Sequence, residues 1–294
     1  MTPPVLDFDP SREGVAPKEA ATLVVLRDTD HGVEVFCVER SKQSKFMGGA
    51  VVFPGGKLDP TDLDARWIAS VGAASPRNAL FSADPDTARG LAIAACREAL
   101  EEAALFFVAG GALAHDDVLR LRARAATDHG VILEALESTG LVLDLAALEP
   151  LARWLTPTAE ARRFDTRFYL ARAPEGQAGA HDAYETTSSF WATAADVLAR
   201  FARREVFLAP PTQRTLEHLL AAETVDAAFA VARRASLDVI CPKLVVQDGT
   251  MALVLPGDPE HDVPEMRSIG KSRYVMRGDV FLPEDAPNLQ RPSR

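Results

Sequence analysis

Residues 97–102 read Arg97-Glu98-Ala99-Leu100-Glu101-Glu102, and the turn Phe53-Pro54-Gly55-Gly56 precedes them along the chain. On a helix, Glu98 and Glu102 lie one turn apart on one face, with Glu101 beside them. Like charges at this spacing repel, so the cluster is locally unfavourable. Carboxylate oxygens are, however, the ligands that a divalent cation such as Mg2+ prefers. The segment therefore predicts either a solvated acidic helix face or a metal site, and the glycine turn before it favours the metal site.

The acidic cluster is predicted to lie on a helix that runs from residue 84 to about residue 108. Asp84-Pro85-Asp86-Thr87 supplies a capping side chain and a proline for its first turn, and Gly110-Gly111 ends it. Ala104 falls late in this predicted helix, where alanine stabilises a helix more than glycine would. The apolar face that would anchor the helix consists of Leu91, Ala95, Ala99 and Phe106.

Strands and helices follow one another in a mixed order along the rest of the chain. Strands are predicted at residues 21–27, 33–40 and 49–53, with turn residues joining the first two into a hairpin. Later strands are predicted at 164–171, around 190, at 243–247 and 251–255 as a second hairpin, and at 274–282. Further helices are predicted near 67, at 116–126, 131–138, 194–203 and 225–234, and from 210 onward. This order indicates an α/β fold, more strictly α+β, in which helices cover a mixed sheet.

Composition excludes several classes of protein. The chain has 294 residues, a formal net charge of -10 and no long basic run, which argues against nucleic acid or an anionic membrane as a main partner. Its three cysteines form no C-x-x-C pair, so neither a disulfide framework nor a zinc site is predicted. No signal peptide and no apolar stretch of about 20 residues is visible. These features predict a cytoplasmic protein.

The glycine turn and the acidic helix together resemble the Nudix box, the signature of the Nudix hydrolase superfamily. Gly56 is followed after five residues by Asp62, where the family has glutamate, and the second half of the box is 97–105. The family separates these halves by seven residues, but here 34 residues intervene between Asp62 and Arg97. A surface loop tolerates such lengthening at a cost on the order of 0.6 kcal/mol per doubling of its length. The resemblance therefore implies an α/β/α sandwich whose Nudix box contains an insertion.

A second pattern narrows the resemblance. Arg40-Ser41, Lys45, Gly49 and the turn 53–56 keep the spacing that marks coenzyme A diphosphatases of this superfamily, with lysine replacing an arginine at 45. The long insertion and the segments 154–157 and 163–168 resemble the animal peroxisomal type. The implied organisation is a Nudix domain at 1–235, with an insertion at about 63–86 and a helical excursion at about 111–150. Residues 236–294 would form a β-hairpin extension at the C-terminus.

The resemblance implies a metal-dependent active site on the acidic helix. Glu98, Glu101 and Glu102 would ligate Mg2+ or Mn2+, and Glu101 and Glu102 would take part in catalysis, Glu102 or a later carboxylate helping to deprotonate the attacking water. Arg97 would orient a glutamate through charge-assisted hydrogen bonds. The plainer interpretation is a simple ion pair between Arg97 and Glu101, which are four residues apart on the helix. The orienting role and the simple ion pair can both hold.

Four residues are predicted to meet the substrate. Arg40 and Lys45 are candidates for phosphate contacts, although each also suits a solvated strand end. Gly55 and Gly56 either let the backbone approach a diphosphate closely or simply form a tight turn.

Three further residues are weaker candidates. Asp62 takes the place of the family's early glutamate, and the insertion leaves open whether it stays at the site. Glu185 stands where many Nudix proteins have an acidic loop residue, and Arg163, with Arg162, is a candidate for a 3'-phosphate contact. Four histidines show no spacing typical of metal ligation or a catalytic triad: His115, His129, His181 and His218.

These patterns predict a pyrophosphohydrolase that cleaves coenzyme A or an acyl-CoA to adenosine 3',5'-bisphosphate and 4'-phosphopantetheine or its acylated form. Two alternatives stay open: a hydrolase of another nucleoside diphosphate derivative such as NADH, ADP-ribose or a nucleotide sugar, and a Nudix scaffold that binds without catalysis. The expected partner is a CoA-like small molecule, with no nucleic acid and no membrane, and a homodimer is left open.

Overall fold

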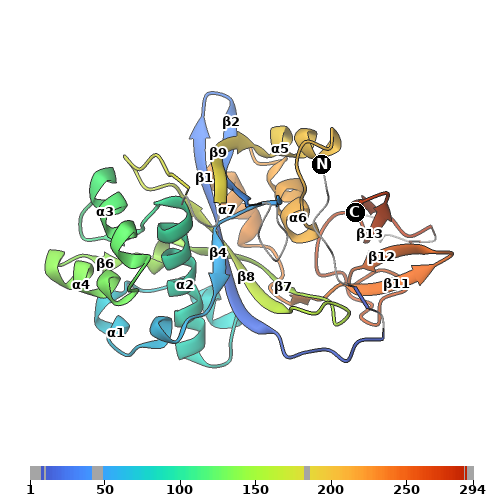
Figure 1. Ribbon diagram of the computed structural model, residues 1–294, viewed down its shortest axis with the longest axis horizontal. Helices are drawn as coiled ribbons and strands as arrows, with labels where there is room; N and C mark the ends of the chain where they lie inside the picture. Colours follow the sequence, from blue (N-terminus) through green and yellow to red (C-terminus); the bar gives the residue numbers. More distant parts are fainter. Residues whose placement is uncertain (1–7, 10, 42–48, 182–185, 288, 290–294) are drawn as a thin grey trace.

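A mixed β-sheet forms the centre of the molecule. The computed structural model describes residues 8–9, 11–41, 49–181, 186–287 and 289. Within them, an eight-stranded sheet has the order β10-β7-β8-β1-β2-β3, with β4 paired to β1 and β9 paired to β2 (Figure 1). The strands are β1 Lys18–Thr29, β2 Gly32–Arg40, β3 Val51–Val52, β4 Gly55–Lys57, β7 Glu149–Leu155, β8 Phe164–Arg172, β9 Thr186–Thr193 and β10 Val239–Ile240.

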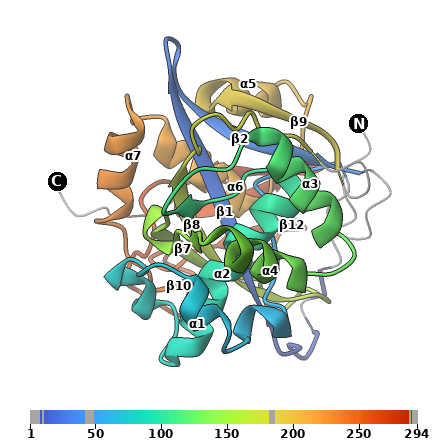
Figure 2. The same cartoon turned by 90° about the vertical axis from the view of Figure 1, so that its left-hand side faces the viewer.

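Helices cover both faces of this sheet, as the two views show (Figures 1 and 2). On β1, Leu23 and Val25 face one core together with α2, whereas Val24 and Leu26 face the other core, as the alternation of side chains along a strand requires. The first face carries α1 Trp67–Ser70, α2 Pro85–Ala103, α3 His115–Ala125 and α4 Gly130–Thr139. The second face carries α5 Ala194–Ala202, α6 Pro210–Leu219 and α7 Val225–Ala232. The predicted α/β/α sandwich with a mixed sheet is confirmed.

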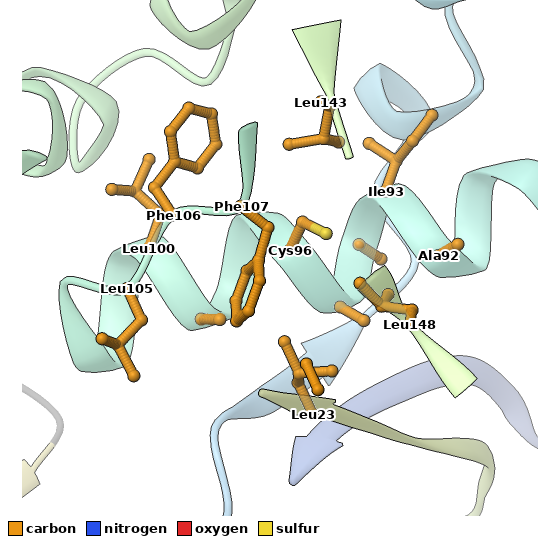
Figure 3. Packing of buried hydrophobic residues seen from close by; sticks show 14 of the residues in the cluster. Leu23, Ala92, Ile93, Cys96, Leu100, Leu105, Phe106, Phe107, Leu143 and Leu148 are labelled. Atoms are coloured by element: carbon orange, nitrogen blue, oxygen red, sulfur yellow. The ribbon is translucent and has the colours of Figure 1, made fainter. Parts of the chain in front are cut away.

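Helix α2 begins as the sequence predicts but ends earlier. The Asp84 side chain accepts a hydrogen bond from the Thr87 backbone N–H, and Pro85 occupies the first turn. The helix ends at Ala103, and Ala104 adopts a left-handed conformation with φ 51°. The prediction that the helix continues to 108, with Ala104 inside it, is wrong because the residues after it leave the helix to fill the core (Figure 3). Those residues are Leu105, Phe106 and Phe107.

The inserted segment is tied closely to the rest of the fold. It forms a 3-10 turn η1 at Pro60–Leu63, then α1, then a second 3-10 turn η2 at Pro76–Leu80. The Asn78 side chain donates to the Ala88 carbonyl and accepts from the Tyr169 hydroxyl, both at 2.8 Å. Arg77 donates to Glu149 and to the Ala232 carbonyl. The insertion therefore packs against the start of α2 and against strand β7.

The predicted helical excursion contains α3 and α4, and it ends in a strand that the sequence analysis missed. The short strands β5 Val108–Ala109 and β6 Val142–Leu143 pair at its base. Strand β7 then starts at Glu149 and pairs with both β8 and β10. Its Pro150 and its lack of alternation hide it as a strand in the sequence, since proline is unusual inside a sheet. Backbone pairing with β8 and β10 on its two sides makes this segment a strand, and the strand propensity of its own residues does not.

A second sheet of four strands covers part of the α5–α7 face, visible at the right of Figure 1. Its strands are β11 Lys243–Gln247, β12 Thr250–Val254, β13 Arg273–Arg277 and β14 Val280–Glu284. The hairpin of β11 and β12 is confirmed, but the single strand predicted at 274–282 is wrong. It is a hairpin that turns at Gly278, whose φ is 69°.

The second sheet shares a core with the first. Leu253, Tyr274 and Phe281 pack in one cluster with Phe207 and Leu216. In the described part of the chain, no helix is long and apolar enough to cross a membrane.

Candidate active site

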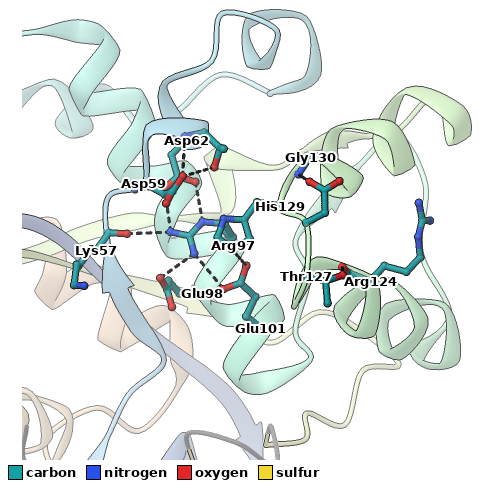
Figure 4. Close-up of polar contacts among 12 residues, drawn as sticks. Lys57, Asp59, Asp62, Arg97, Glu98, Glu101, Arg124, Thr127, His129 and Gly130 are labelled. Atoms are coloured by element: carbon teal, nitrogen blue, oxygen red, sulfur yellow. Dashed lines mark hydrogen bonds and ion pairs between the residues drawn. The ribbon is translucent and has the colours of Figure 1, made fainter. Parts of the chain in front are cut away.

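Arg97 is the centre of a buried network of charged groups (Figure 4). Only 4% of its surface is exposed. Its Nε and Nη2 donate to the two Asp62 oxygens at 2.9 and 3.0 Å, and Nη2 also donates to the Lys57 carbonyl at 3.0 Å. Nη1 donates to Glu98 at 2.9 Å and to Glu101 at 3.1 Å. The predicted pairing of Arg97 with Glu101 is therefore present, within a larger network in which one guanidinium fixes three carboxylates.

The structure brings Asp62 to the site in spite of the insertion. Asp62 is 1% exposed, and it belongs to η1, directly after β4. A capping box holds this turn, because the Asp59 N–H donates to Asp62 at 2.9 Å and the Asp59 side chain accepts from the Thr61 N–H. Both Asp62 oxygens bind Arg97 in the bidentate arrangement that favours arginine–carboxylate pairs. Asp62 therefore positions Arg97, and the Asp62 side chain lies behind the helix glutamates.

Glu98 lies against the glycine turn. A Cβ atom built at Gly56 would be 2.2 Å from Glu98 Oε1, which no real pair of atoms tolerates. Gly56 therefore leaves the space that the carboxylate occupies.

Glu102 is tied to the neighbouring glycine. The Gly55 backbone N–H donates to Glu102 Oε2 at 3.0 Å, and a Cβ atom at Gly55 would be 2.6 Å from the Ala21 carbonyl oxygen on β1. The glycine turn thus contacts two helix glutamates directly, and close backbone approach is the role that the structure gives to both glycines.

Glu101 has the most unusual environment of the three glutamates. Its Oε1 is buried and makes no hydrogen bond, but His129 Nε2 lies 3.3 Å away, within ion-pair distance. Burial raises the pKa of the Glu101 carboxyl to about 7, while the Arg97 guanidinium lowers it and the Glu98 carboxylate adds to the rise. A buried carboxylate oxygen that accepts no hydrogen bond is a candidate ligand for a cation.

A cavity of about 1130 Å3 opens at these glutamates and continues over the sheet. One end is polar and is lined by Gly55, Gly56 and the network of Arg97 with its glutamates. The remaining lining is mostly apolar and aromatic, with Trp154, Phe168, Phe207, Leu253 and Phe281, but it also includes the charged residues Arg40, Glu160 and Arg162. The cavity can therefore hold a ligand that is charged at one end and apolar at the other.

The other predicted site residues are distributed unevenly around the cavity. Arg40 lines it. Arg163 donates instead to the backbone carbonyls of Thr156 and Val15, whereas its neighbour Arg162 is exposed and lines the cavity. Lys45 and Glu185 lie outside the described residues.

Sequence reasoning missed two residues of the polar end. His129 comes from the turn before α4, and Lys57 ends β4 and lines the cavity beside Gly56. Spacing carried no signal for His129, because the folding of the excursion decides its position. Lys57 could have been found from its place directly after the glycine turn.

The carboxylate oxygens of the helix glutamates are the type of ligand that a hard divalent cation such as Mg2+ or Mn2+ prefers. Their side chains are not, however, arranged to coordinate one. The glutamates offer carboxylate oxygens, and Glu101 Oε1 accepts no hydrogen bond. Among the described residues, however, no three His, Cys, Asp or Glu side chains are grouped closely enough to hold a metal ion. The reason is visible in the network, since Glu98 and Glu101 turn toward Arg97 and Glu102 turns toward Gly55.

The fold and this site define a Nudix hydrolase. The crystal structure of a NUDIX hydrolase from Alicyclobacillus acidocaldarius is similar, with a TM-score of 0.64 and 30% sequence identity, over 74% of this chain and 96% of that one. Within this superfamily the chain belongs to the family of the NUDT19 Nudix domain, whose model matches residues 73–219, half of the chain. The resemblance predicted from the split Nudix box is confirmed.

Relatives in vertebrates carry the name acyl-coenzyme A diphosphatase NUDT19. The protein from Gallus gallus is 30% identical over 224 residues, which are 60% of this chain and 58% of that protein. The protein from Homo sapiens is 28% identical over 219 residues, 61% of this chain and 58% of that protein. The protein from Xenopus laevis is 25% identical over 261 residues, 69% of each. The chain thus spans less than two thirds of the chicken and human relatives.

Proposed function

We propose that the protein is a metal-dependent hydrolase that cleaves the diphosphate of coenzyme A or an acyl-CoA. Adenosine 3',5'-bisphosphate and 4'-phosphopantetheine, or its acylated form, would be the products. The observation that carries this proposal is the juxtaposition of Glu98, Glu101 and Glu102 with the turn of Gly55 and Gly56 at the polar end of the cavity.

The glycine turn suits a diphosphate for a steric reason. Without side chains at 55 and 56, the phosphoryl oxygens reach both the backbone and the glutamates of α2. A side chain at either position would collide with β1 or with Glu98. Arg40, on the cavity wall, and Lys45 are proposed to neutralise phosphate charge, because both carry fixed positive charge.

Mg2+ or Mn2+ would be held by Glu98, Glu101 and Glu102. When bound, such an ion supplies charge neutralisation on the phosphoryl oxygens and activation of a water molecule. The protein's own part is to hold these side chains on one helix face. Arg97 positions Glu98 and Glu101 through hydrogen bonds, and Asp62 in turn orients Arg97. Glu102, anchored by the Gly55 N–H, is placed to accept a proton from water beside the diphosphate.

The substrate class rests on the names of the relatives and on the shape of the cavity. Acyl-coenzyme A diphosphatase is the name of the chicken, frog and human relatives. An acyl-CoA combines a diphosphate with a long, less polar arm, and the cavity combines a charged end with an apolar one. This match favours CoA esters over ligands that are polar at both ends.

The test is a substrate panel with the purified protein and Mg2+ or Mn2+. Adenosine 3',5'-bisphosphate should appear from coenzyme A and acyl-CoAs. Glu101→Gln and Glu102→Gln should each lower kcat at least 100-fold while the protein stays folded. Glu137→Gln, on the exposed end of α4, is the matched control and should leave kcat unchanged.

Two results would overturn the proposal. Hydrolysis of NADH or ADP-ribose without action on any CoA ester would assign a different nucleoside diphosphate substrate. Metal binding without turnover of any diphosphate would indicate a scaffold that binds without catalysis.

A further inference from the structure

We infer that the apolar arm of the cavity, floored by β8 and β7 and roofed by the four-stranded C-terminal sheet, binds the acyl chain of an acyl-thioester substrate. This inference rests on the proposed function, because it takes the diphosphate to lie at the glutamates of α2. It adds a second binding site, about which the acidic cluster carries no information.

The floor of the cavity is one continuous strip of the central sheet. Gly55 on β4 pairs with Thr22 on β1, and Thr22 pairs with Phe168 on β8. Residues directly opposite one another on paired strands project to the same face, so these three residues form a row across the sheet. A second row on the same face, two residues along, consists of Lys57, Ala20, Thr166 and Trp154. Every member of both rows lines the cavity.

Polarity changes along both rows in the same direction. Each row starts at β4 with a residue of the polar end, Gly55 or Lys57. Small or hydroxyl-bearing residues occupy the middle on β1 and at Thr166. The rows reach aromatic side chains at Phe168 and Trp154. A ligand lying along the strip therefore passes from a charged to a hydrogen-bonding and then to an apolar environment. The sequence of groups in an acyl-CoA is the same: diphosphate, amide-containing pantetheine, acyl chain.

The C-terminal sheet closes the apolar end from the opposite side. Leu253 on β12 and Phe281 on β14 line the cavity although they are only 3% and 0% exposed. The Phe281 ring packs edge-on against Phe8 at 5.9 Å between centroids, and Phe207 completes this wall. These nearly buried side chains form an apolar, almost closed end of the cavity. Such an end suits an aliphatic chain.

The dimensions of the strip fit the pantetheine arm. Three strand spacings separate β4 from β7, which is roughly 14 Å. The pantetheine backbone is about as long as four residues of extended chain, which is also roughly 14 Å. A diphosphate at Gly55 and Gly56 therefore places the thioester near Trp154, and the acyl chain continues beneath Leu253 and Phe281.

The decisive measurement is kcat/KM for coenzyme A and for acyl-CoAs of increasing chain length. Each buried methylene raises binding up to about fourfold, so kcat/KM should rise with chain length until the arm is filled. Leu253→Phe narrows the arm and should lower kcat/KM for long acyl-CoAs at least tenfold, with less than a threefold change for coenzyme A. Val246→Phe adds similar bulk to the same sheet at a residue that is 52% exposed and does not line the cavity, so it should change neither.

A measurement on the unaltered protein covers the case in which Leu253→Phe does not fold. S-acyl-pantetheines, which lack the nucleotide, should inhibit coenzyme A hydrolysis competitively and more strongly as the acyl chain lengthens. Hydrolysis of CoA esters with no dependence on chain length, in either assay, would overturn this inference and leave the proposed function intact. Absence of any CoA ester hydrolysis would overturn the proposed function itself.

Discussion

At the scale of single residues, the site depends on one arginine. Arg97 has four carboxylate or carbonyl partners within 3.1 Å. Burial opposes its charge, but its hydrogen bonds to Asp62 and the negative charges of the nearby glutamates raise its pKa above the ordinary arginine value. The guanidinium thus stays charged and lets three carboxylates lie close together. The like-charge repulsion expected from the sequence is offset at this point.

Replacing this arginine should destabilise the fold. Arg97→Met leaves Asp62 buried without a counter-charge, and removing one partner of a buried pair costs about 3–5 kcal/mol. The free energy of unfolding in urea should fall by that amount. Arg120→Met removes an exposed pair with Asp117 and should change it by less than about 1 kcal/mol. Equal losses in the two variants would show that the buried network contributes no special stability.

Gly56→Ala should impair activity more than stability. The new Cβ would displace the Glu98 carboxylate, which is the flexible end of a side chain, so the fold can adjust while the proposed metal ligand moves. We expect kcat/KM for coenzyme A to fall at least tenfold and the melting temperature to change little. Gly72→Ala is the control, since its nearest neighbour would be the Leu143 carbonyl oxygen at 3.5 Å. Activity equal to that of the unaltered protein would separate Glu98 from the reaction.

At the scale of secondary-structure elements, the features that neighbouring residues determine were predicted correctly from the sequence. The cap at Asp84 and the hairpin turn at 248–249 are set by neighbouring residues, and both were predicted. Strand β7 and the end of α2 depend on distant contacts. Gln177 bonds the backbone N–H and carbonyl of Phe106 at 2.8 and 3.1 Å, and it thereby satisfies groups that a longer helix would have used. Such long-range partners leave no mark in the sequence.

The left-handed end of α2 gives a matched pair of substitutions. Ala104 has φ 51°, a conformation that costs a non-glycine residue about 1–2 kcal/mol. Ala104→Gly relieves that cost, whereas Ala103→Gly, one residue earlier in the helix, adds about 1 kcal/mol of helix penalty. Both alanines are fully buried, so the loss of a methyl group is common to both. Ala104→Gly should therefore be more stable than Ala103→Gly by about 2–3 kcal/mol in urea unfolding. The reverse order would contradict the left-handed cap.

At the scale of the whole molecule, the fold class and the helix glutamates were predictable because the Nudix box survives on both sides of its insertion. The depth of the cavity was not predictable. It arises where β4, β8, β7 and the C-terminal sheet meet, and these elements are spread along the chain from Gly55 to Glu284. His129 reaches Glu101 for the same kind of reason, because the excursion folds back over α2.

The stability of the C-terminal sheet should depend on acid. Burial would raise the pKa of Asp258, but hydrogen bonds from Arg273, Ser272 and the Glu260 N–H outweigh it and hold that pKa below its ordinary value. A lowered pKa in the folded state contributes stability above the unfolded value of about 3.9, and this contribution is lost as the pH falls further. The melting temperature should thus drop between about pH 5 and pH 3.

Asp258→Asn should lower the melting temperature at pH 7 and flatten its fall in acid. The exposed Asp279→Asn is the control and should keep the full acid dependence. An unchanged profile in Asp258→Asn would assign the acid sensitivity to other carboxylates.

The salt bridge between Asp62 and Arg97 has a consequence for how this chain can vary. It joins the residue just before the insertion to the helix just after it, so the distance between the two halves of the site is fixed by 2.9–3.0 Å contacts and not by the number of residues between them. Chain length and active-site geometry are thereby uncoupled. The exposed surface of the insertion can therefore acquire new side chains while the chemistry beside it is kept, provided that the contacts of Arg77 and Asn78 with the rest of the fold remain.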